Sequence, residues 1–560
     1  MNKISLSYPS VPGIALLLLF LISCGQKKQA PAGSDIVAKP EDLHKKVVED
    51  IRTAVDFAVS NNNDIGDSLI LFNTTLVQSV YEKNNYEPVW SGNSQWKTLG
   101  DSLLQFIKQS KLYGLFPEDY HYKELHRMEL RLIADSIGKL DRKDAALWSR
   151  ADILLTDAFM HIVSDIKLGR LPNDSISMRK DSVLANEFYL HQFDTLQQLQ
   201  TLFPVITTLE PAHEGYRLLK EGIARFLDSA DYNEYTKVPA PSKKETPEFR
   251  AALQKRLFEG GYLAFDSVAA DSTQLADAVK SFQKQKGITV DGKAGEGTVR
   301  WLNTTDRDRF IRIAISLDRY KLLPEQMPEK YIWVNLPSFY MRLHDKDSIK
   351  LVSKIVCGKV NTRTPLLTSA ISEIITYPQW TPPNSIIVKE ILPAAKRDPG
   401  YFAKKGFSVL DQEGNEVDPY TVEWSKYSKG IPYKVVQGSG DANALGVLKF
   451  NFPNKYAVYL HDTNQRSLFG VPVRTLSHGC VRVQEWQKLA QYIIRNEKPK
   501  AKPAEKFPML DSMDSWLSRK EKHSIPVRNR VPVYIRYFTC EGKDGKVVFY
   551  DDIYSEDKRL

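Results

Sequence analysis

The stretch YLHDTNQRSLFGVPVRTLSHGCVRV, residues 459–483, holds two histidines and a cysteine in a chain that has four cysteines in all. A cysteine thiolate is both a nucleophile and a metal ligand, and a nearby imidazole can accept the proton of the thiol. Cys480 is therefore a candidate nucleophile, metal ligand, disulfide partner or buried thiol.

If Cys480 is the nucleophile, the candidate acceptor of its thiol proton is His461, which lies nineteen residues before Cys480. If YAVYLHDT (456–463) forms a strand, its side chains alternate, so Tyr459 and His461 share one face and Tyr456 points into the core. Gly479 lets the backbone of the segment that carries Cys480 approach this strand closely. The pattern thus predicts that strand pairing brings an imidazole and a phenol to the thiol.

Acyl transfer also needs an oxyanion hole, and loss of one donor typically costs about 3 kcal/mol in the barrier. The backbone amides of Gly479 and Cys480 are candidate donors, and the Tyr459 hydroxyl can assist them. A nearby cation favours the thiolate over the thiol, and we expect Arg482 on the same strand face as Cys480.

The competing hypotheses are a zinc site and a structural thiol. Zinc could take His461, His478 and Cys480, but no fourth ligand and no CxxC motif is apparent. An odd number of free cysteines in a chain that we expect to be exported favours a reactive thiol or an intermolecular partner. Residue chemistry alone leaves the nucleophile and the buried thiol both open. Cys357 and Cys540 lie in apolar, strand-like contexts, so we expect buried free thiols there.

The N-terminus predicts export. Lys3 precedes the apolar run VPGIALLLLFLIS, which has the length of a signal peptide rather than a membrane span. The run ends in LISC, which resembles a lipobox and predicts a lipidated Cys24. An ordinary signal peptide with an incidental cysteine is the alternative. The resemblance to bacterial lipoproteins implies that Gly25 after the cysteine favours the outer membrane, if the cell has one.

Composition suits several folded domains. One core seldom exceeds about 300 residues, so 560 residues indicate more than one domain. Helical apolar spacing dominates as far as the Pro- and Lys-rich linker at 237–248, and period-two patterns begin near residue 330. The net charge of +9 suits an anionic polymer, but we find no nucleic-acid motif.

Residues 249–306 resemble a small three-helix peptidoglycan-binding domain. Asp271 or Ser272 is the expected cap of its second helix, and Gly287 the expected end. The resemblance is carried by Ala278, Phe282, Gln283, Gly287, Val290, Asp291, Gly292, Gly295 and Thr298.

His461, fifteen further residues and then SHGCVR resemble the signature of L,D-transpeptidases with a YkuD-type catalytic domain. Segments 334–343, 356–386, 443–463 and 531–554 are similar to the large, multidomain YcbB-type subgroup. The resemblance implies that Cys480 is the acyl-accepting nucleophile. It implies that His461, rather than His478, is the general base, oriented by the Asp462 carbonyl.

The resemblance also implies supporting residues. It places Tyr459 and the amides of Gly479 and Cys480 at the oxyanion position, and Ser477 and His478 in the shape of the loop. A mobile lid corresponds to about residues 384–432. Candidate substrate-binding residues, for which core packing or surface pairing is the alternative, are Arg482, Arg474, Trp380 and Asn443.

The expected fold is multidomain α+β. Its predicted parts are a lipoprotein signal peptide (1–23), a flexible tether (24–45), a helical scaffold domain (46–236), a three-helix peptidoglycan-binding domain (249–306), a mainly-β catalytic domain with the inserted lid (328–500) and a C-terminal extension packing on the catalytic or scaffold region (501–560).

The implied function is a peptidoglycan L,D-transpeptidase of the cell envelope that needs neither metal nor other cofactor. Its partners would be donor and acceptor stem peptides and, through Cys24, a membrane. Carbapenems acylate the cysteine of this family. The alternatives are a non-catalytic peptidoglycan-binding lipoprotein, an L,D-carboxypeptidase and a cysteine peptidase of another fold.

Overall fold

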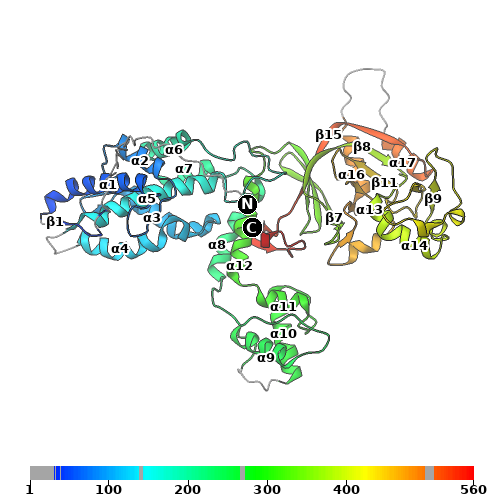
Figure 1. The fold of residues 1–560 in the computed structure, drawn as a ribbon, viewed down its shortest axis with the longest axis horizontal. Coiled ribbons are helices and arrows are strands. Elements are labelled where there is room, and N and C mark those ends of the chain that lie inside the picture. Colours follow the sequence, from blue (N-terminus) through cyan, green and yellow to red (C-terminus); the bar gives the residue numbers. More distant parts are fainter. Residues whose placement is uncertain are drawn as a thin grey trace, which may run out of the picture. The chain divides into compact units, whose positions relative to one another are not determined.

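The computed structural model describes residues 31–137, 143–264, 271–497 and 510–559, apart from Ala32 and Ala38 (Figure 1). The predicted signal peptide and Cys24 lie outside the described residues. The chain divides into two compact units. One comprises the residues up to Leu104 together with Glu118–His161, and the other comprises Gln105–Pro117 and the chain from Ile162 onward. No helix in these described ranges is long and apolar enough to span a membrane.

The first unit is helical, as its apolar spacing predicts. The buried Asp152 carboxylate accepts hydrogen bonds from the Val89, Trp90 and Ser91 amides at 2.8–3.0 Å. A buried charge is tolerated only when it is well hydrogen-bonded, so Asp152 fixes this segment. The elements are α1 (Leu43–Ser60), α2 (Thr74–Lys83), α4 (Tyr122–Ile137), the first parts of α3 (Thr98–Lys108) and α5 (Ala145–Lys167), and the strand pairs β1 (Ile36–Val37) with β4 (Lys143–Asp144) and β2 (Ser91–Gly92) with β3 (Gln95–Trp96).

The second unit contains further helices, three of which form the small helical domain. The Asp271 side chain caps α10 in a capping box with Gln274, and Gly287 ends the helix in the left-handed region at φ 67°, as predicted. The helices are α6 (Asn186–Leu199), α7 (Leu202–Leu209), α8 (Glu214–Ser229), α9 (Pro247–Glu259), α10 (Ser272–Lys286), α11 (Glu296–Asn303) and α12 (Asp306–Lys321), of which α9–α11 share one hydrophobic cluster.

A nine-stranded sheet builds the C-terminal half of the chain. Its order is β13-β7-β14-β12-β11-β8-β15-β5-β6, and β6 pairs back onto β7, so eight of the strands close into a ring. Closure leaves these strands without a free edge. The strands are β5 (Lys330–Asn335), β6 (Tyr340–Asp345), β7 (Ser348–Gly358), β8 (Leu367–Thr376), β11 (Leu448–Asn451), β12 (Leu460–His461), β13 (Thr475–Ser477), β14 (Val481–Val483) and β15 (Ser524–Arg536).

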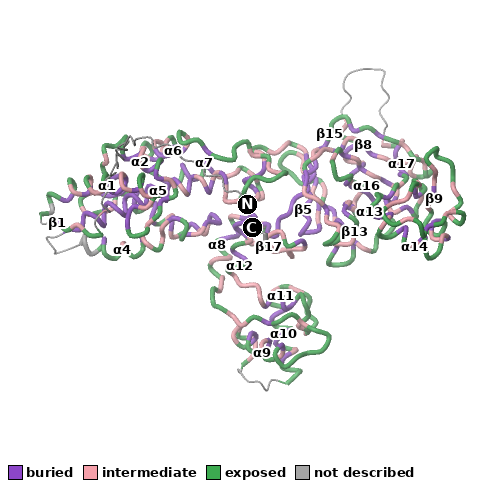
Figure 2. The backbone as a smooth tube through the Cα atoms, viewed as in Figure 1, coloured by how far each residue is buried: buried purple, intermediate pink, exposed green. Residues whose placement is uncertain are grey.

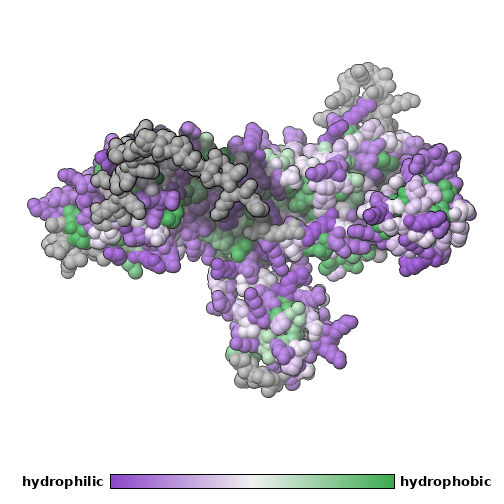
Figure 3. Space-filling view, in the orientation of Figure 1, coloured by the Kyte–Doolittle hydropathy of each residue, from purple (hydrophilic) through white to green (hydrophobic). Residues whose placement is uncertain are grey.

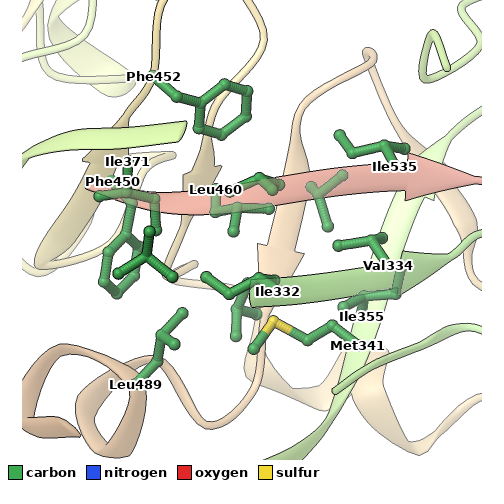
Figure 4. Packing of buried hydrophobic residues seen from close by; sticks show 14 of the residues in the cluster. Ile332, Val334, Met341, Ile355, Ile371, Phe450, Phe452, Leu460, Leu489 and Ile535 are labelled. Atoms are coloured by element: carbon green, nitrogen blue, oxygen red, sulfur yellow. The ribbon is translucent and has the colours of Figure 1, made fainter. Parts of the chain in front are cut away.

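The inward side chains of this sheet form one apolar core. Figure 4 shows Ile332, Met341, Phe450 and Leu460 packed together, with Leu489 reaching in from α16 (Trp486–Arg495). Full burial of such a side chain stabilises the fold by about 1.5–3 kcal/mol. The buried residues follow the strands in Figure 2, whereas hydrophilic residues predominate on the face drawn in Figure 3.

The C-terminal segment supplies a strand of the sheet, whereas the sequence predicts only an extension that packs on the catalytic or scaffold region. Strand β15 lies between β8 and β5, and α17 (Leu510–Ser518) adds the buried Met513 to the core. The hairpin of β16 (Cys540–Lys543) and β17 (Lys546–Phe549) contacts α8 closely. A Cβ atom at Gly542 would lie 2.0 Å from backbone atoms of Leu218, so this approach requires glycine.

An insertion between β8 and β11 carries its own core, in the region where the sequence predicts a lid. Trp424, Phe402, Ile391, Leu392 and Val435 are buried together in it. Its elements are α13 (Asn384–Ile386), a π-helical turn (Ile387–Ile391), α14 (Leu392–Arg397), α15 (Tyr401–Lys404), β9 (Phe407–Leu410) and β10 (Lys434–Gln437). We refer to residues 384–437 as the insert.

Candidate active site

Two short parallel strands carry the residues that could do chemistry. In the pairing of β12 with β14, Leu460 lies opposite Val481 and His461 lies opposite Arg482. Leu460 and Val481 are fully buried in the core of the sheet. Side chains alternate along a strand, so His461 and Arg482 face the opposite way.

One register position earlier, Tyr459 lies beside Cys480. The Val481 amide donates a hydrogen bond of 3.1 Å to the Tyr459 carbonyl, which continues the strand pairing to this position. Tyr459 and His461 therefore share one face, as the period of two predicts, and their rings meet edge-on at 5.6 Å. The pairing of two strands thus brings the phenol, the imidazole and the thiol together.

The segment before β12 is a turn rather than the predicted longer strand. Ala457 has φ +53°, and the Asn454 side chain accepts hydrogen bonds of 3.1 Å from the Tyr456 and Val458 amides. Asparagine side chains often replace strand pairing in this way. Tyr456 is 45% exposed, so the prediction that it points into the core is wrong.

The SHGC loop is held by hydroxyl groups. Gly479 has φ +127°, a conformation that favours glycine. The Ser477 hydroxyl donates to the Cys480 carbonyl at 2.6 Å and accepts from the Gly479 amide at 3.2 Å, while the Thr364 hydroxyl donates to the Gly479 carbonyl at 2.8 Å. Ser477 thus has the shaping contacts expected of it. The Gly479 amide, an expected oxyanion donor, is already engaged.

The Cys480 thiol is partly buried, and Sγ lies 3.9 Å from the Ala457 carbonyl oxygen. Burial raises the pKa of this thiol above its ordinary value. Contacts with the backbone and side chain of Tyr459, followed by the charges of Lys449 and Arg482, act in the opposite direction but do not prevail. The resting group at neutral pH is therefore a thiol that needs a base.

His461 is 4% exposed. Burial, followed by the charge of Arg482, lowers the pKa of its imidazole to about 3, against the opposing effect of the Asp462 and Leu445 carbonyls. Among the described residues Nδ1 has no partner in ordinary hydrogen-bond geometry, so these carbonyl contacts are long or poorly aligned. The ring is neutral at physiological pH, as a proton acceptor must be.

No hydrogen bond joins the His461 ring to Cys480 Sγ in the described structure, although the two residues are diagonal neighbours on one face. Catalytic hydrogen bonds are often long in ligand-free sites and shorten when substrate binds. The arrangement is therefore a neutral thiol and a neutral imidazole within one strand position of each other.

Comparison with known families identifies the domain that carries these residues. Residues 329–501, which include all four residues on this face, match the YkuD family model, described as an L,D-transpeptidase catalytic domain. This segment is an L,D-transpeptidase catalytic domain. Residues 75–223 match a scaffold domain, and residues 246–302 match a family described as "Putative peptidoglycan binding domain".

A curated protein of Haemophilus influenzae, named "Putative L,D-transpeptidase", is 34% identical to this chain over 293 residues. The alignment covers 52% of this chain and 57% of that protein, so this chain spans little more than half of its relative's length.

Two solved structures are also similar. An L,D-transpeptidase of Stackebrandtia nassauensis is 15% identical, covering 46% of this chain and 91% of its own, at a TM-score of 0.15. One from Xylanimonas cellulosilytica is 15% identical, covering 54% and 100%, at a TM-score of 0.15. TM-scores this low carry no argument, so the assignment rests on the family match and the curated relative.

Trp380 lies at the base of the insert in the transpeptidase domain. Its backbone pairs with Gln437 through hydrogen bonds of 3.1 and 2.7 Å. Burial and then Cys480 raise the pKa of Tyr459, and the Trp380 side chain acts in the opposite direction, which places the indole beside the phenol. The structure therefore brings Trp380 to the site, and Tyr459 keeps its hydroxyl proton.

The sequence predicts that Arg474 and Asn443 line the substrate cleft, but the structure places both inside the protein. The Arg474 guanidinium is buried and donates to the carbonyls of Phe339, Ile355 and Val471 at 3.0–3.1 Å. Asn443 is also buried and holds its own loop through three backbone contacts of 2.8–3.4 Å. These donors are already used within the protein, so both residues support the fold instead.

Asp462 also holds a loop with its carboxylate. Oδ2 accepts from Arg466 at 2.9 Å and from the Val447 amide at 3.0 Å. A Cβ atom at Gly446, which has φ +65°, would lie 2.3 Å from that oxygen. The carboxylate thus fixes the loop whose Leu445 carbonyl faces the imidazole.

Arg482 and His478 take different directions. Arg482 Nη1 donates to Gln465 at 2.9 Å, whereas its buried Nε has no hydrogen-bond partner among the described residues. His478 Nε2 contacts the Glu390 carboxylate of the insert, not Cys480. The structure places Arg482 opposite His461 on the face that carries Cys480, and it gives His478 a contact with the insert.

Sequence reasoning missed Lys449. Its neighbours Leu448 and Phe450 are fully buried, so Lys449 projects from the opposite side of β11, the side of His461. The alternation in LKFN could have indicated this face, but only the pairing of β11 with β12 places the lysine at the site.

Proposed function

We propose that the chain is a peptidoglycan L,D-transpeptidase with Cys480 as nucleophile and His461 as general base. The observation that carries this proposal is that Tyr459, His461, Cys480 and Arg482 share one face of the β12–β14 pair inside a domain of this family. A neutral imidazole beside a neutral thiol is the arrangement that general-base activation of a nucleophile requires.

The donor is a tetrapeptide stem that ends in meso-diaminopimelate, or a similar dibasic residue, followed by D-Ala. His461 accepts the thiol proton as Cys480 Sγ attacks the carbonyl between these residues, and the Tyr459 hydroxyl donates to the oxyanion. The C–N bond then breaks, the imidazolium protonates the departing D-Ala amine, and a thioester remains on the enzyme.

The side-chain amine of an acceptor stem then attacks this thioester. The amine gives a proton to His461, which passes it to the departing thiolate, and a cross-link forms between the third residues of two stems. Water in place of the amine makes the reaction a carboxypeptidase reaction. Arg482, which lies on the same face as Cys480, binds an oxygen acceptor of the substrate.

The remaining domains serve the same substrate in this proposal. The unit at 246–302 binds peptidoglycan, and a lipid on Cys24 anchors the protein in the cell envelope, at the periplasmic face of the outer membrane if the cell has one. Loss of membrane association in a Cys24→Ala strain is the expected result. Equal membrane association of variant and wild type contradicts the anchor.

Disaccharide-tetrapeptide incubated with purified protein tests the reaction. Wild type should produce cross-linked dimers and release D-Ala, and Cys480→Ala should produce neither. Cys540→Ala is the matched control, because Cys540 is a buried free thiol of the C-terminal hairpin. Mass spectrometry after meropenem should show an adduct on the Cys480 peptide. Undiminished dimer formation by Cys480→Ala overturns the proposal, and sacculus binding without acylation favours a binding protein.

A further inference from the structure

Lys449 occupies the same sheet face as the proposed nucleophile. In the antiparallel pairing of β11 with β12, Lys449 lies opposite His461, so these side chains emerge on one side. Phe450 and Leu460 lie on the other side, packed in the core (Figure 4). Three adjacent strands, β11, β12 and β14, therefore present Lys449, His461 and Arg482 in one row.

The Lys449 ammonium lies over the ring of Tyr459. Nζ is 3.9 Å from the ring centroid, well within the range of a cation–π contact. Tyr459 is the register neighbour of Cys480, so this contact holds the ammonium and the phenol next to the sulfur. Burial lowers the pKa of Lys449 and Cys480 acts in the opposite direction, just as Lys449 lowers the pKa of the Cys480 thiol against the larger effect of burial.

The Lys449 ammonium has no direct counterion among the described residues. Glu373 of β8 is the acidic group that favours the charged form of Lys449, but its carboxylate accepts from Asn451 at 2.6 Å and from Ser524. In the described residues no ion pair joins Glu373 to Lys449. A partly buried ammonium without a direct counterion suits a site in which negative charge develops during reaction.

The proposed mechanism needs such a charge. Burial raises the pKa of the Cys480 thiol, and in the part of the chain that the structure describes no hydrogen bond joins His461 to Sγ. The cations that stabilise the thiolate are Lys449 and Arg482, and Arg482 already donates to Gln465.

We propose that Lys449 is a positioning residue of the transpeptidase site, which holds the Tyr459 phenol beside Cys480 and stabilises the negative charge that develops on Sγ. The proposal rests on Cys480 as the nucleophile. It assigns Lys449 a fixed positive charge and not proton transfer, so arginine can replace lysine and an uncharged side chain cannot.

The rate at which iodoacetamide alkylates Cys480, followed by peptide mass spectrometry as a function of pH, tests this role in the full chain. The ionisable groups that act on the sulfur are Tyr459, Lys449 and Arg482, and His461 shares their sheet face. Lys449→Met should raise the midpoint by about one pH unit, which lowers alkylation near neutral pH about tenfold. Lys449→Arg should stay close to wild type.

Lys350→Met is the matched control, since Lys350 is exposed on β7 of the same sheet. Its alkylation profile should equal that of wild type. Thermal unfolding of each variant identifies any loss of folding, and the midpoint is compared among folded variants. The dimer-forming rate should fall in Lys449→Met and recover in Lys449→Arg.

Three outcomes overturn the proposal. They are an unchanged midpoint in folded Lys449→Met, a Lys449→Arg profile shifted as far as that of Lys449→Met, and a shift of the same size in Lys350→Met. Failure of the proposed function looks different. In that case wild type forms no cross-linked product, while the alkylation midpoint still reports whether Lys449 acts on Cys480.

Discussion

Tyr459 and Cys480 are neighbours across a parallel strand pair, and the 3.1 Å hydrogen bond from Val481 to the Tyr459 carbonyl keeps them in register. The Tyr459 side chain lowers the pKa of the thiol against the larger effect of burial. The phenol therefore lies where it favours the thiolate, and in the proposed mechanism it donates to the oxyanion that forms on the substrate carbonyl attacked by the sulfur.

Removal of this hydroxyl should slow acylation. Tyr459→Phe keeps the ring under the Lys449 ammonium but loses the donor, so we expect kcat to fall about 10²-fold or more. The midpoint of Cys480 alkylation should move to higher pH. Tyr456→Phe is the control, because Tyr456 lies in the preceding turn and is 45% exposed. Equal kcat values for the two variants contradict a donor role for Tyr459.

Replacement of each histidine distinguishes the base from its neighbour. His461→Ala should lower kcat by about 10²–10⁴-fold, the usual contribution of a general base. His478→Ala should mainly change KM, because His478 contacts Glu390 of the insert. Glu390→Ala should reproduce that change, and the double variant should add little to it. A larger loss of kcat from His478→Ala than from His461→Ala reverses the assignment.

Gly479 should tolerate no side chain, although there is room for one. A Cβ atom there would lie 3.6 Å from its nearest neighbour, the Arg363 carbonyl oxygen, so the obstacle is the φ of +127°. Gly479→Ala should cost about 1–2 kcal/mol of stability or distort the loop. We expect a lower denaturation midpoint and a lower kcat. Gly470→Ala, where a Cβ atom meets open space, is the control. Wild-type values for Gly479→Ala refute the strained loop.

Acid should destabilise the fold through its buried histidines. Burial is the largest cause that lowers the pKa of His461 to about 3 and of His213 and His344 to about 4. In the unfolded chain these groups titrate near 6.5. Between about pH 6.5 and 4 the unfolded state binds protons that the folded state does not, so the free energy of unfolding falls with falling pH.

Denaturation midpoints measured from about pH 8 to about pH 4.5 test this. The His344 ring stacks on Tyr331 at 4.5 Å, so His344→Phe keeps the stacking and removes a titrating group. That variant should lose less stability with falling pH than wild type does. His126→Phe, at an exposed histidine, should follow wild type. Identical pH dependence in wild type and His344→Phe contradicts the expectation.

Some of the site could be predicted because its signals are local. The caps at Asp271 and Gly287 are set by neighbouring residues, and the alternation around Tyr459 and His461 follows from the backbone geometry of a strand. The SHGC motif indicates Cys480 through a local signal as well, because a glycine directly before the thiol allows a tight turn there.

Other features could not be predicted because they depend on pairing between distant segments. Strand β15 contains Pro526 and Pro532, which argue against a central strand, yet a register shift after Pro526 accommodates it in the sheet. From the sequence alone, Arg474 could equally well bind substrate or support the fold. Its use by three backbone carbonyls is visible only in the folded chain.

The sequence by itself determined which residue is the candidate nucleophile, which histidine can serve it, and the three-helix unit beside the catalytic region. The tertiary structure alone decided that Lys449 stands over Tyr459, that His478 contacts the insert, and that the C-terminus completes the sheet. The physical reason is that periodicity and capping are short-range, whereas strand register is chosen by burial of the whole core.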